Sequence, residues 1–201
     1  YLVLRWHGIE TPRTVLAVGR KRILEAAHGF AGPFLTKSDH GGKGLGIRLF
    51  ESPGELAAYL DSGALERVLD NRVILQEYIR TEDPFVTRVE LAGGRFLFAM
   101  RLSTAPFDPH PVGGRRAEKR ASANVRVATC RVTLSPSPIQ AHDPLVQKYL
   151  ALCEKERIDI AGIEFLEDER GRRYTYDLHA NTRHDEAFGK LPKGTVERLK
   201  K

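Results

Sequence analysis

Short apolar runs recur along the chain and are bounded by Gly, Pro, Asn or Asp, which is the pattern of β-strands joined by turns. Gly93-Gly94 separates two of these runs, and Asp168 to Gly171 separates two others, so each pair predicts a β-hairpin. The strands predicted in this way cover residues 14–18, 34–36, 47–50, 73–76, 86–91, 95–102, 125–132, 160–167 and 174–179.

Helix signals lie between the predicted strands. Residues 21–28 have a helical pattern, and Ser52-Pro53-Gly54-Glu55 has the form of a capped helix start, with a helix predicted to about residue 60. Asp143-Pro144 caps another helix, in which apolar residues recur at helical spacing through Cys153. Because the strands are paired by hairpins rather than joined throughout by crossover helices, the sequence predicts an α+β fold.

Composition excludes some classes of protein. The 201 residues are 41% hydrophobic and 29% charged, which is ordinary for a folded protein with a real core. No run of about eighteen apolar residues occurs and the start does not resemble a secretory signal, so we expect a cytoplasmic protein without a membrane segment. Cys130 and Cys153 lack zinc-site spacing and are interpreted as buried thiols.

The net charge of +6 raises the question of nucleic-acid binding. The basic residues are scattered, and the one dense run, residues 115–120, follows two glycines and reads as a solvated loop. Aromatic content is 8%, without an RNA-binding signature. We therefore predict no nucleic-acid partner, and a basic nucleic-acid-binding domain is an interpretation that rests on charge alone.

A glycine-rich loop follows the strand that ends near Lys37. Lys43 is followed by Gly44 rather than Ser or Thr, which excludes a Walker loop, and Ile47 stands where the Rossmann pattern needs Gly. A strand follows the loop, so the pattern predicts a hairpin flap that could lay backbone N–H groups over phosphates, with Lys37 directed at the same anion. The alternative is a surface hairpin with solvated lysines.

Two acids interrupt the apolar strands of the last predicted hairpin. Asp177, His179 and Asn181 fall on one face of their strand, and the turn at 168–171 would set Asp177 beside Glu164. Two buried carboxylates repel unless a cation lies between them, and Mg²⁺ is that cation where the partner is a nucleotide phosphate. The alternative is that both acids form structural salt bridges with arginines.

Taken together, these motifs resemble the ATP-grasp superfamily, nearest to its RimK-like carboxylate–amine ligases. The resemblance covers residues 8 to about 185 and includes the Lys37 strand with its glycine flap, the segment at 73–79, and Glu164 followed by Asp177-Leu178-His179. It implies two α+β lobes whose antiparallel sheets hold a nucleotide between them. Residues 1–78 would form the small lobe with the flap and residues 79–201 the large lobe with the metal site, and the family's N-terminal α/β domain is expected to be absent from this chain.

The resemblance also implies roles for individual residues. Lys37 would hold the α and β phosphates of ATP, and the flap would cover the β and γ phosphates. Glu77 and Tyr78 would form the adenine hinge mainly through backbone groups, and Glu82 or Asp83 would bind the ribose. The implied nucleotide-binding residues are Lys37, Gly41, Gly42, Lys43, Gly44, Gly46, Gln76, Glu77, Tyr78, Ile79 and Glu82; the implied catalytic residues are Arg88 and Arg101; and the implied ligands of Mg²⁺, or of Mn²⁺, are Glu164, Asp177 and either His179 or Asn181.

The implied activity is ATP- and Mg²⁺-dependent ligation of a carboxylate to an amine through an acyl phosphate. The substrates would be small molecules or peptides, and a homo-oligomer is compatible with this activity. Residues 107–126 are rich in arginine and would line the pocket for an anionic acceptor, unless they form a solvated loop. The alternative is a degenerate ATP-grasp module that binds nucleotide without ligation. His179 favours it, because the family usually has Asn at that position and imidazole prefers softer metals than Mg²⁺.

Overall fold

The computed structural model describes residues 1–37, 47–62, 72–81, 85–103, 126–127 and 134–180. The chain divides into two compact units. Unit 1 comprises residues 1–11, 80–103 and 132–201, and unit 2 comprises residues 12–79 and 104–131. Each unit contains one antiparallel sheet with helices on it, so the predicted α+β class is confirmed.

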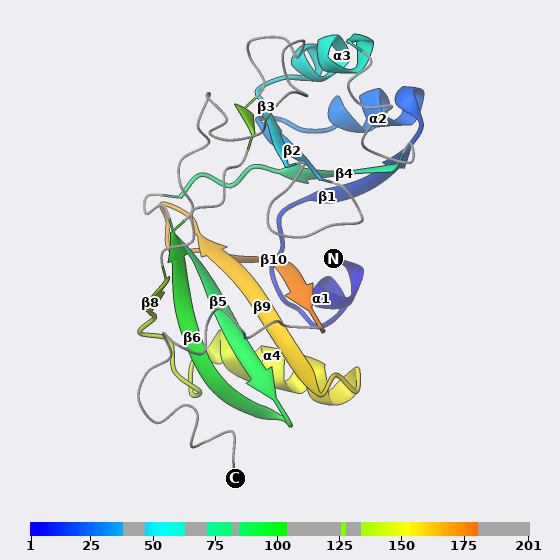
Figure 1. The fold of residues 1–201 in the computed structure, drawn as a ribbon. Coiled ribbons are helices and arrows are strands. Elements are labelled where there is room, and N and C mark those ends of the chain that lie inside the picture. The colour runs from blue at the N-terminus through cyan, green and yellow to red at the C-terminus, as the bar shows by residue number, and fades with distance from the viewer. Residues whose placement is uncertain (38–46, 63–71, 82–84, 104–125, 128–133, 181–201) are drawn as a thin grey trace, which may run out of the picture. The chain divides into compact units, whose positions relative to one another are not determined.

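Unit 2 is built on a five-stranded sheet with the strand order β1-β4-β2-β3-β7 (Figure 1). Helices α2 and α3 pack on one face of it, and their apolar residues form one core with alternate residues of the strands. In that core Phe34 stacks on Phe50, with ring centroids 5.9 Å apart, and the Tyr59 ring packs against Phe50 in a tilted arrangement at 5.6 Å. The elements are β1 (Thr14–Val18), α2 (Arg20–Ala27), β2 (Phe34–Lys37), β3 (Arg48–Phe50), α3 (Pro53–Asp61), β4 (Arg72–Glu77) and β7 (Arg126–Val127).

Unit 1 is built on a second five-stranded sheet, with the strand order β10-β9-β5-β6-β8. Helix α4 covers one face of this sheet (Figure 1), and its buried residues pack against Val89, Ile163 and Phe165. The elements are α1 (Leu2–Trp6), β5 (Phe85–Ala92), β6 (Arg95–Ser103), β8 (Leu134–Pro136), α4 (Pro144–Lys155), β9 (Ile160–Glu167) and β10 (Arg173–His179).

The predicted helix caps are present. Ser52 accepts a hydrogen bond from the Glu55 N–H at 3.3 Å, and Asp143 accepts one from the Leu145 N–H at 2.9 Å, in each case with Pro at the next position. The hairpin between β5 and β6 turns through Gly93 and Gly94, whose φ angles of +56° and +70° are those that a two-residue turn of this kind requires of glycine.

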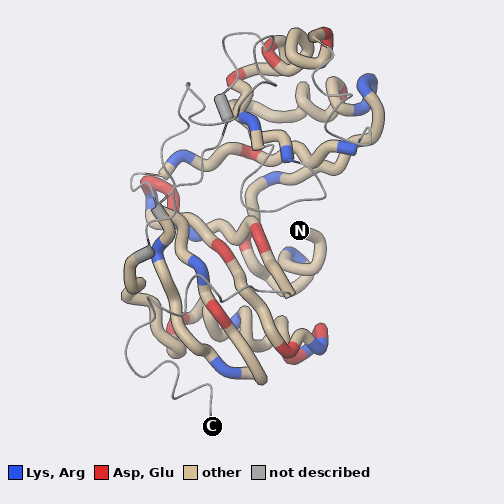
Figure 2. Tube along the Cα trace, viewed as in Figure 1, with Lys and Arg blue, Asp and Glu red and all other residues tan. Residues whose placement is uncertain are grey.

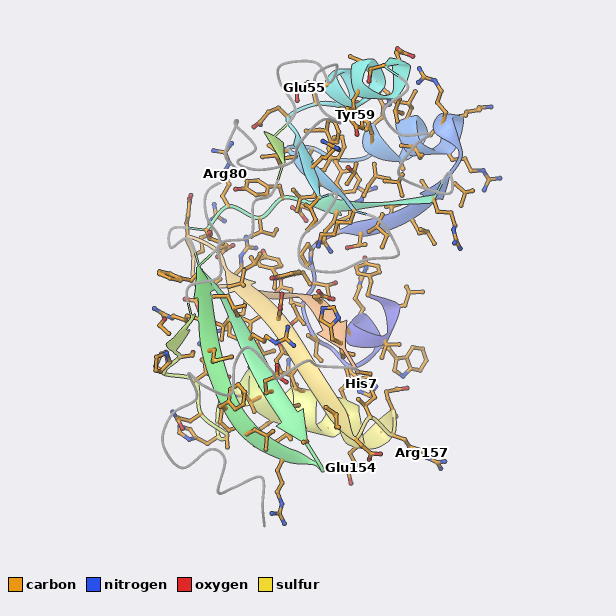
Figure 3. All side chains as sticks on the ribbon, viewed as in Figure 1. His7, Glu55, Tyr59, Arg80, Glu154 and Arg157 are labelled. Atoms are coloured by element: carbon orange, nitrogen blue, oxygen red, sulfur yellow. The ribbon has the colours of Figure 1, made fainter. Side chains whose placement is uncertain are left out.

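The N-terminal segment belongs to unit 1, although the predicted division placed residues 1–78 in one lobe. Leu4 and Ile9 are buried in the α4 core. Glu10 accepts a backbone hydrogen bond from the Thr175 N–H at 2.8 Å. His7, seen close to the C-terminal end of α4 in Figure 3, pairs with Glu156 at 2.8 Å. Burial of these side chains ties the segment to the sheet of unit 1.

Two elements were not predicted. Helix α1 is five residues long with one buried side chain, and β8 lies in a Pro- and Ser-rich stretch that reads as loop. Of the strand predicted at 125–132, the structure describes β7 at Arg126–Val127, while residues 128–133 lie outside the described ranges. None of the described helices has the length and apolar character needed to cross a membrane.

Candidate functional site

Three charged residues stand in one row across the sheet of unit 1. Arg88 on β5 is the register partner of Glu164 on β9, and Glu164 is the register partner of Asp177 on β10. Residues paired in this way point to the same face of a sheet. That face is opposite to α4, because Ile163 and Phe165, the neighbours of Glu164, are in the α4 core. The structure therefore brings Glu164 and Asp177 together, side by side.

The pairing of Glu164 with Asp177 depends on a β-bulge. From Arg173 to Thr175 the strand β10 pairs regularly with β9, and Thr175 is opposite Phe165. The register then shifts, so that Tyr176 is an extra residue and Asp177, rather than Tyr176, is opposite Glu164. Without this bulge Asp177 would be opposite Ile163 and would face the apolar core.

Each acid in the row is already engaged by protein groups. Arg88 Nη1 donates to Glu164 Oε1 at 3.0 Å, and the Tyr176 hydroxyl donates to Glu164 Oε2 at 2.7 Å. His179 Nε2 lies 2.7 Å from Asp177 Oδ2. The alternative that both acids form salt bridges with arginines is confirmed for Glu164, which pairs with Arg88, whereas Asp177 forms an ion pair with His179.

The acidic residues on this face of the sheet raise the pKa values of two basic groups, Arg88 and His179. Burial alone lowers the pKa of Arg88, but the charges and hydrogen bonds of Glu90 and Glu164 outweigh it and raise that pKa. The hydrogen bond that His179 donates to Asp177 raises the pKa of His179; partial burial and the charge of Arg88 oppose this, and the charges of Asp177 and Glu164 add to the rise. Both groups therefore favour their charged forms beside the acids.

Glu90 is a member of this face that sequence reasoning missed. Its Oε1 accepts a hydrogen bond from Arg88 Nε at 2.6 Å, and the residue is 2% exposed. Its second oxygen, Oε2, is buried and has no hydrogen-bond partner in the structure as described. The available signal was an acid inside the apolar sequence Val89-Glu90-Leu91, the same kind of interruption that identified Glu164.

The donor set suits Mg²⁺. This ion is usually bound through one or two carboxylates together with substrate phosphates and water. Glu164 and Asp177 supply two carboxylates on one face, and a carboxylate has about four lone-pair sites, so it can accept more than one hydrogen bond or metal contact. Within the described ranges no group of three or more His, Cys, Asp and Glu residues is placed to hold a metal, so the predicted set of Glu164, Asp177 and His179 does not form a three-ligand cluster there; Asn181 lies outside those ranges.

Arg101 is not brought together with Arg88. On β6, Met100 is the register partner of Arg88, and Arg101 is the partner of Thr87. Thr87 is in turn opposite Phe165, so Arg101 lies on the face that α4 covers. Because successive side chains of a strand alternate between faces, the two arginines predicted to share one catalytic role lie on opposite sides of the sheet.

In unit 2, Lys37 is held in a chain of hydrogen bonds across three strands. Lys37 Nζ donates to Gln76 Oε1 at 2.6 Å, and Gln76 Nε2 donates to Thr14 Oγ1 at 2.9 Å. These residues of β2, β4 and β1 lie on the face opposite to the α2 and α3 core. The predicted lysine is therefore fixed in position, and Gln76 fixes it through its side chain.

The predicted adenine hinge follows β4. The N–H of Glu77 donates to the Arg13 carbonyl at 2.8 Å and the N–H of Tyr78 donates to the Pro33 carbonyl at 3.0 Å. Both amides are thus used within unit 2. Ile79 N–H has no partner among the described residues, so it is the backbone donor of this segment that a ligand could engage.

The flap glycines Gly41, Gly42, Gly44 and Gly46, Lys43, the ribose candidates Glu82 and Asp83, and Asn181 all lie outside the described residues. So do Cys130 and nearly all of the arginine-rich stretch at 107–126. Cys153 is buried as a free thiol, and burial raises its pKa.

Charges of both signs are distributed over the described strands and helices. Figure 2 shows acidic and basic positions interleaved along the traced parts of both units. Arg88, for example, pairs with two acids, Glu90 and Glu164, within a single patch. The positive net charge is therefore not concentrated in the sheet that carries the candidate site.

Solved structures of ATP-grasp ligases have the same fold. The chain aligns with the ATP-grasp ligase PsnB complexed with minimal precursor (TM-score 0.62, 19% identity, 94% of this chain and 54% of that one). It also aligns with D-alanine–D-alanine ligase from Bacillus anthracis (TM-score 0.63, 17% identity, 99% of this chain and 59% of that one). A third match is a RimK domain ATP-grasp protein from Sphaerobacter thermophilus (TM-score 0.58, 16% identity, 94% of this chain and 60% of that one). No family model and no curated protein matches the sequence.

The chain therefore has the ATP-grasp fold, as the sequence motifs predicted. A RimK domain protein is among the structures that it resembles. The chain spans about half the length of the PsnB and D-alanine–D-alanine ligase chains that it matches, so the likeness describes the fold that they share over that length.

Proposed function

We propose that this protein is an ATP-grasp ligase that joins a carboxylate to an amine, with ATP converting the carboxylate to an acyl phosphate. The observation that carries the proposal is the pair Glu164 and Asp177, which lie opposite each other on the face of the sheet that α4 does not cover, next to Arg88. On an ATP-grasp fold, such a row of two acids and one arginine suits the binding of a metal-bound phosphate.

In unit 1, Glu164 and Asp177 would hold the Mg²⁺ of the bound nucleotide. When bound, the ion neutralises phosphate charge and polarises the terminal phosphoryl group. Arg88 would donate to the transferred phosphoryl oxygens, and Glu164 and Glu90 hold its guanidinium in place at 3.0 and 2.6 Å. A donor that is held before the reaction stabilises developing charge without a cost of reorganisation.

In unit 2, Lys37 would bind the phosphates of ATP, and the glycine-rich segment after it would supply backbone N–H groups. Gln76 supports this role, since its side chain fixes the Lys37 amine at 2.6 Å. The Ile79 N–H and the neighbouring carbonyls would bind the adenine ring. His179 would orient Asp177, to which it is hydrogen bonded, and Asn181 would be the third metal ligand.

The substrates would be small molecules or peptides. PsnB has been solved with a precursor peptide and a nucleotide analogue, with its minimal precursor together with Mg and ADP, and D-alanine–D-alanine ligase with ATP. These ligands favour amino-acid or peptide carboxylates and amines for this chain also, with Mg²⁺ as the metal and Mn²⁺ as an alternative.

Binding of the nucleotide is the first test. The thermal unfolding midpoint of the protein is measured with ATP alone, with ATP and Mg²⁺, and with ATP and Mn²⁺, because a ligand that binds only the folded state raises it. We expect a rise that requires a divalent metal, is lost in Asp177→Asn, and is kept in Glu169→Gln, a matched change at an exposed turn. No metal-dependent rise in the wild-type protein would contradict the proposal.

A second candidate function is nucleotide binding without ligation. The observation that favours it is that Arg88, Tyr176 and His179 already occupy the carboxylates of Glu164 and Asp177. Amino-acid-stimulated release of ADP and phosphate separates the two functions. Metal-dependent ATP binding without stimulated turnover, in a panel of carboxylates and amines, would favour the binding module.

A further inference from the structure

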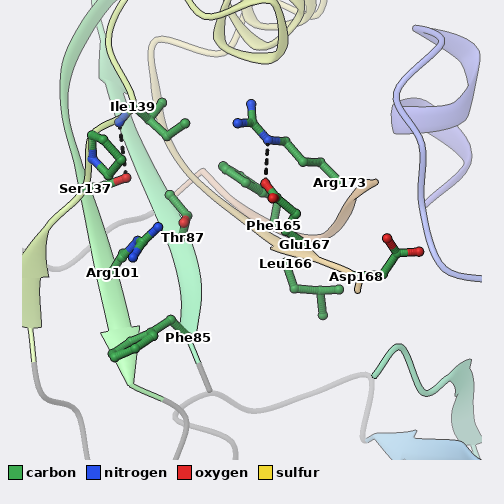
Figure 4. A pocket seen from close by; sticks show the side chains of 11 residues that line it. Phe85, Thr87, Arg101, Ser137, Ile139, Phe165, Leu166, Glu167, Asp168 and Arg173 are labelled. Atoms are coloured by element: carbon green, nitrogen blue, oxygen red, sulfur yellow. Dashed lines mark hydrogen bonds and ion pairs between the residues drawn. The ribbon is translucent and has the colours of Figure 1, made fainter. Parts of the chain in front are cut away.

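Unit 1 contains a hollow on the face of its sheet that α4 covers. The hollow has a volume of about 250 Å³. Phe85 and Thr87 of β5, Arg101 of β6 and Phe165 of β9 line it, and Ile139 closes it from the segment after β8 (Figure 4). These residues belong to one unit and lie on the opposite face of the sheet from Glu164 and Asp177, so the hollow is separate from the proposed catalytic residues.

Arg101 is the uncompensated charge of this hollow. The other arginine in its wall, Arg173, is held by Asp143 at 2.8 Å and by Glu167 at 3.0 Å. Asp168 is held by Arg172 at 2.8 Å. Arg101, by contrast, forms no hydrogen bond or ion pair with any residue that the structure describes; its guanidinium carbon lies 6.0 Å from the centre of the Phe85 ring.

The wall around Arg101 combines one cation with apolar surfaces. The rings of Phe85 and Phe165 and the side chain of Ile139 supply the apolar part, and Thr87 supplies a hydroxyl. A guanidinium binds a carboxylate through two parallel hydrogen bonds, and pockets that bind small molecules are mostly apolar with a few polar groups that fix orientation. In Figure 4 the Arg101 side chain and the Phe85 ring lie on the same side of the hollow.

The volume of the hollow and the charges in its wall limit the kind of ligand that it can bind. Pockets for small molecules commonly measure about 300–1,000 Å³, so a hollow of this size suits one residue rather than a nucleotide. The carboxylates of Glu167 and Asp168 in the same wall disfavour a ligand with several negative charges. A single carboxylate is the anion that one free arginine can neutralise.

We infer that this hollow is a second ligand site, which binds a carboxylate attached to an aromatic or other apolar group. The carboxylate pairs with Arg101, and the apolar group packs between Phe85, Phe165 and Ile139. A free aromatic acid and the C-terminal residue of a peptide share this chemistry. The site does not depend on the proposed ligase activity: Arg101, which the resemblance implied as catalytic, lies on the opposite face from Arg88, and none of the residues to which the proposed function gives a role lines the hollow.

The test uses N-acetyl-L-phenylalanine as the probe and its neutral amide, N-acetyl-L-phenylalaninamide, as the matched ligand. Each is titrated into the ¹⁵N-labelled protein, and amide chemical shifts are followed by NMR. We expect saturable shifts at Thr87, Ile139 and Phe165 with the acid, and at least tenfold weaker binding of the amide. A tripeptide ending in phenylalanine is titrated in parallel; tighter binding of the tripeptide identifies a peptide terminus as the source, and tighter binding of the single residue identifies a free acid.

Variants test whether binding depends on Arg101 itself or on the positive charge of any arginine on this strand. Arg101→Gln is expected to weaken binding of the acid about tenfold and to leave binding of the amide unchanged. Arg95→Gln, on the same strand but at its exposed start, is the control and is expected to bind as the wild type does. Arg101→Lys keeps the charge and is expected to bind with intermediate affinity, which covers the case in which Arg101→Gln does not fold. Equal binding of acid and amide, or wild-type affinity in folded Arg101→Gln, would overturn the inference.

Discussion

Asp177 lies opposite Glu164 across β10 and β9 because Tyr176 is an extra residue in β10. This one-residue shift turns Asp177 away from the α4 core and onto the face that carries Arg88 and Glu90. The bulge is held on both sides of the sheet: the Thr175 hydroxyl pairs with Tyr149 of α4, and the Tyr176 hydroxyl donates to Glu164. The candidate metal site is therefore a product of strand register.

The Tyr176 hydroxyl is expected to support metal binding. It donates to Glu164 Oε2 at 2.7 Å, and residues that orient a metal ligand typically contribute about 10- to 100-fold to metal affinity. Tyr176→Phe should therefore weaken Mg²⁺-dependent ATP binding about tenfold while the protein stays folded, as measured by calorimetric titration. Tyr1→Phe, at an exposed position, is the matched control. An unchanged affinity would count against Glu164 as a metal ligand.

Arg88 and Glu90 are expected to be coupled in stability. Arg88→Met leaves Glu90, which is 2% exposed, as a buried carboxylate without its partner, and such a loss typically costs about 3–5 kcal/mol. Adding Glu90→Gln removes the stranded charge and should recover a large part of this loss. Urea unfolding of the two single variants and the double variant measures the coupling, and strictly additive effects would show that the pair is not an energetic unit.

Asp143 is expected to stabilise the protein in a pH-dependent way. Partial burial by itself raises the pKa of Asp143, but hydrogen bonds from Arg173 and from the Leu145 N–H outweigh it and hold the pKa below the ordinary value of 3.8. The ionised carboxylate therefore stabilises the fold above that value, and the contribution is lost as the pH falls below 3.8 through the folded-state pKa.

The matching variant is Asp143→Asn, which keeps a capping side chain but loses the charge. At pH 7 it should be less stable than the wild type by about 1–2 kcal/mol, and the difference should shrink as the pH falls below 3.8. Unfolding by urea at several pH values measures it. Asp159→Asn, the same change at an exposed position, is the control; a difference that stays constant with pH would contradict the assignment.

The buried pair Tyr149 and Thr175 is expected to link α4 to β10. The two hydroxyl oxygens are 2.5 Å apart, both residues are fully buried, and burial raises the pKa of Tyr149, so the phenol stays neutral. Tyr149→Phe leaves the Thr175 hydroxyl unsatisfied and should cost about 1–3 kcal/mol in urea unfolding. The double variant with Thr175→Val should cost less than the sum of the two single variants. Full additivity would indicate that the hydroxyls do not interact.

Much of the fold could be predicted from local sequence. Ser52 and Asp143 cap α3 and α4, and the Gly93-Gly94 turn joins β5 and β6, because capping and tight turns depend on residues within a few positions of one another. The acids Glu164 and Asp177 were also visible, since each interrupts an apolar strand. Glu90 carried the same signal, because it also interrupts an apolar run.

The sequence by itself determined the elements other than α1 and β8, their hairpin pairing and the residue types of the site, because these follow from periodicity and from neighbouring residues. Tertiary structure alone decided which faces those residues share. The bulge at Tyr176 puts Asp177 beside Glu164, and the register of β6 puts Arg101 on the other side of the sheet from Arg88. A shift of one residue in the register reverses the face of every side chain that follows it. The contacts that determine the register, such as that of Tyr149 with Thr175, join residues that are distant in sequence.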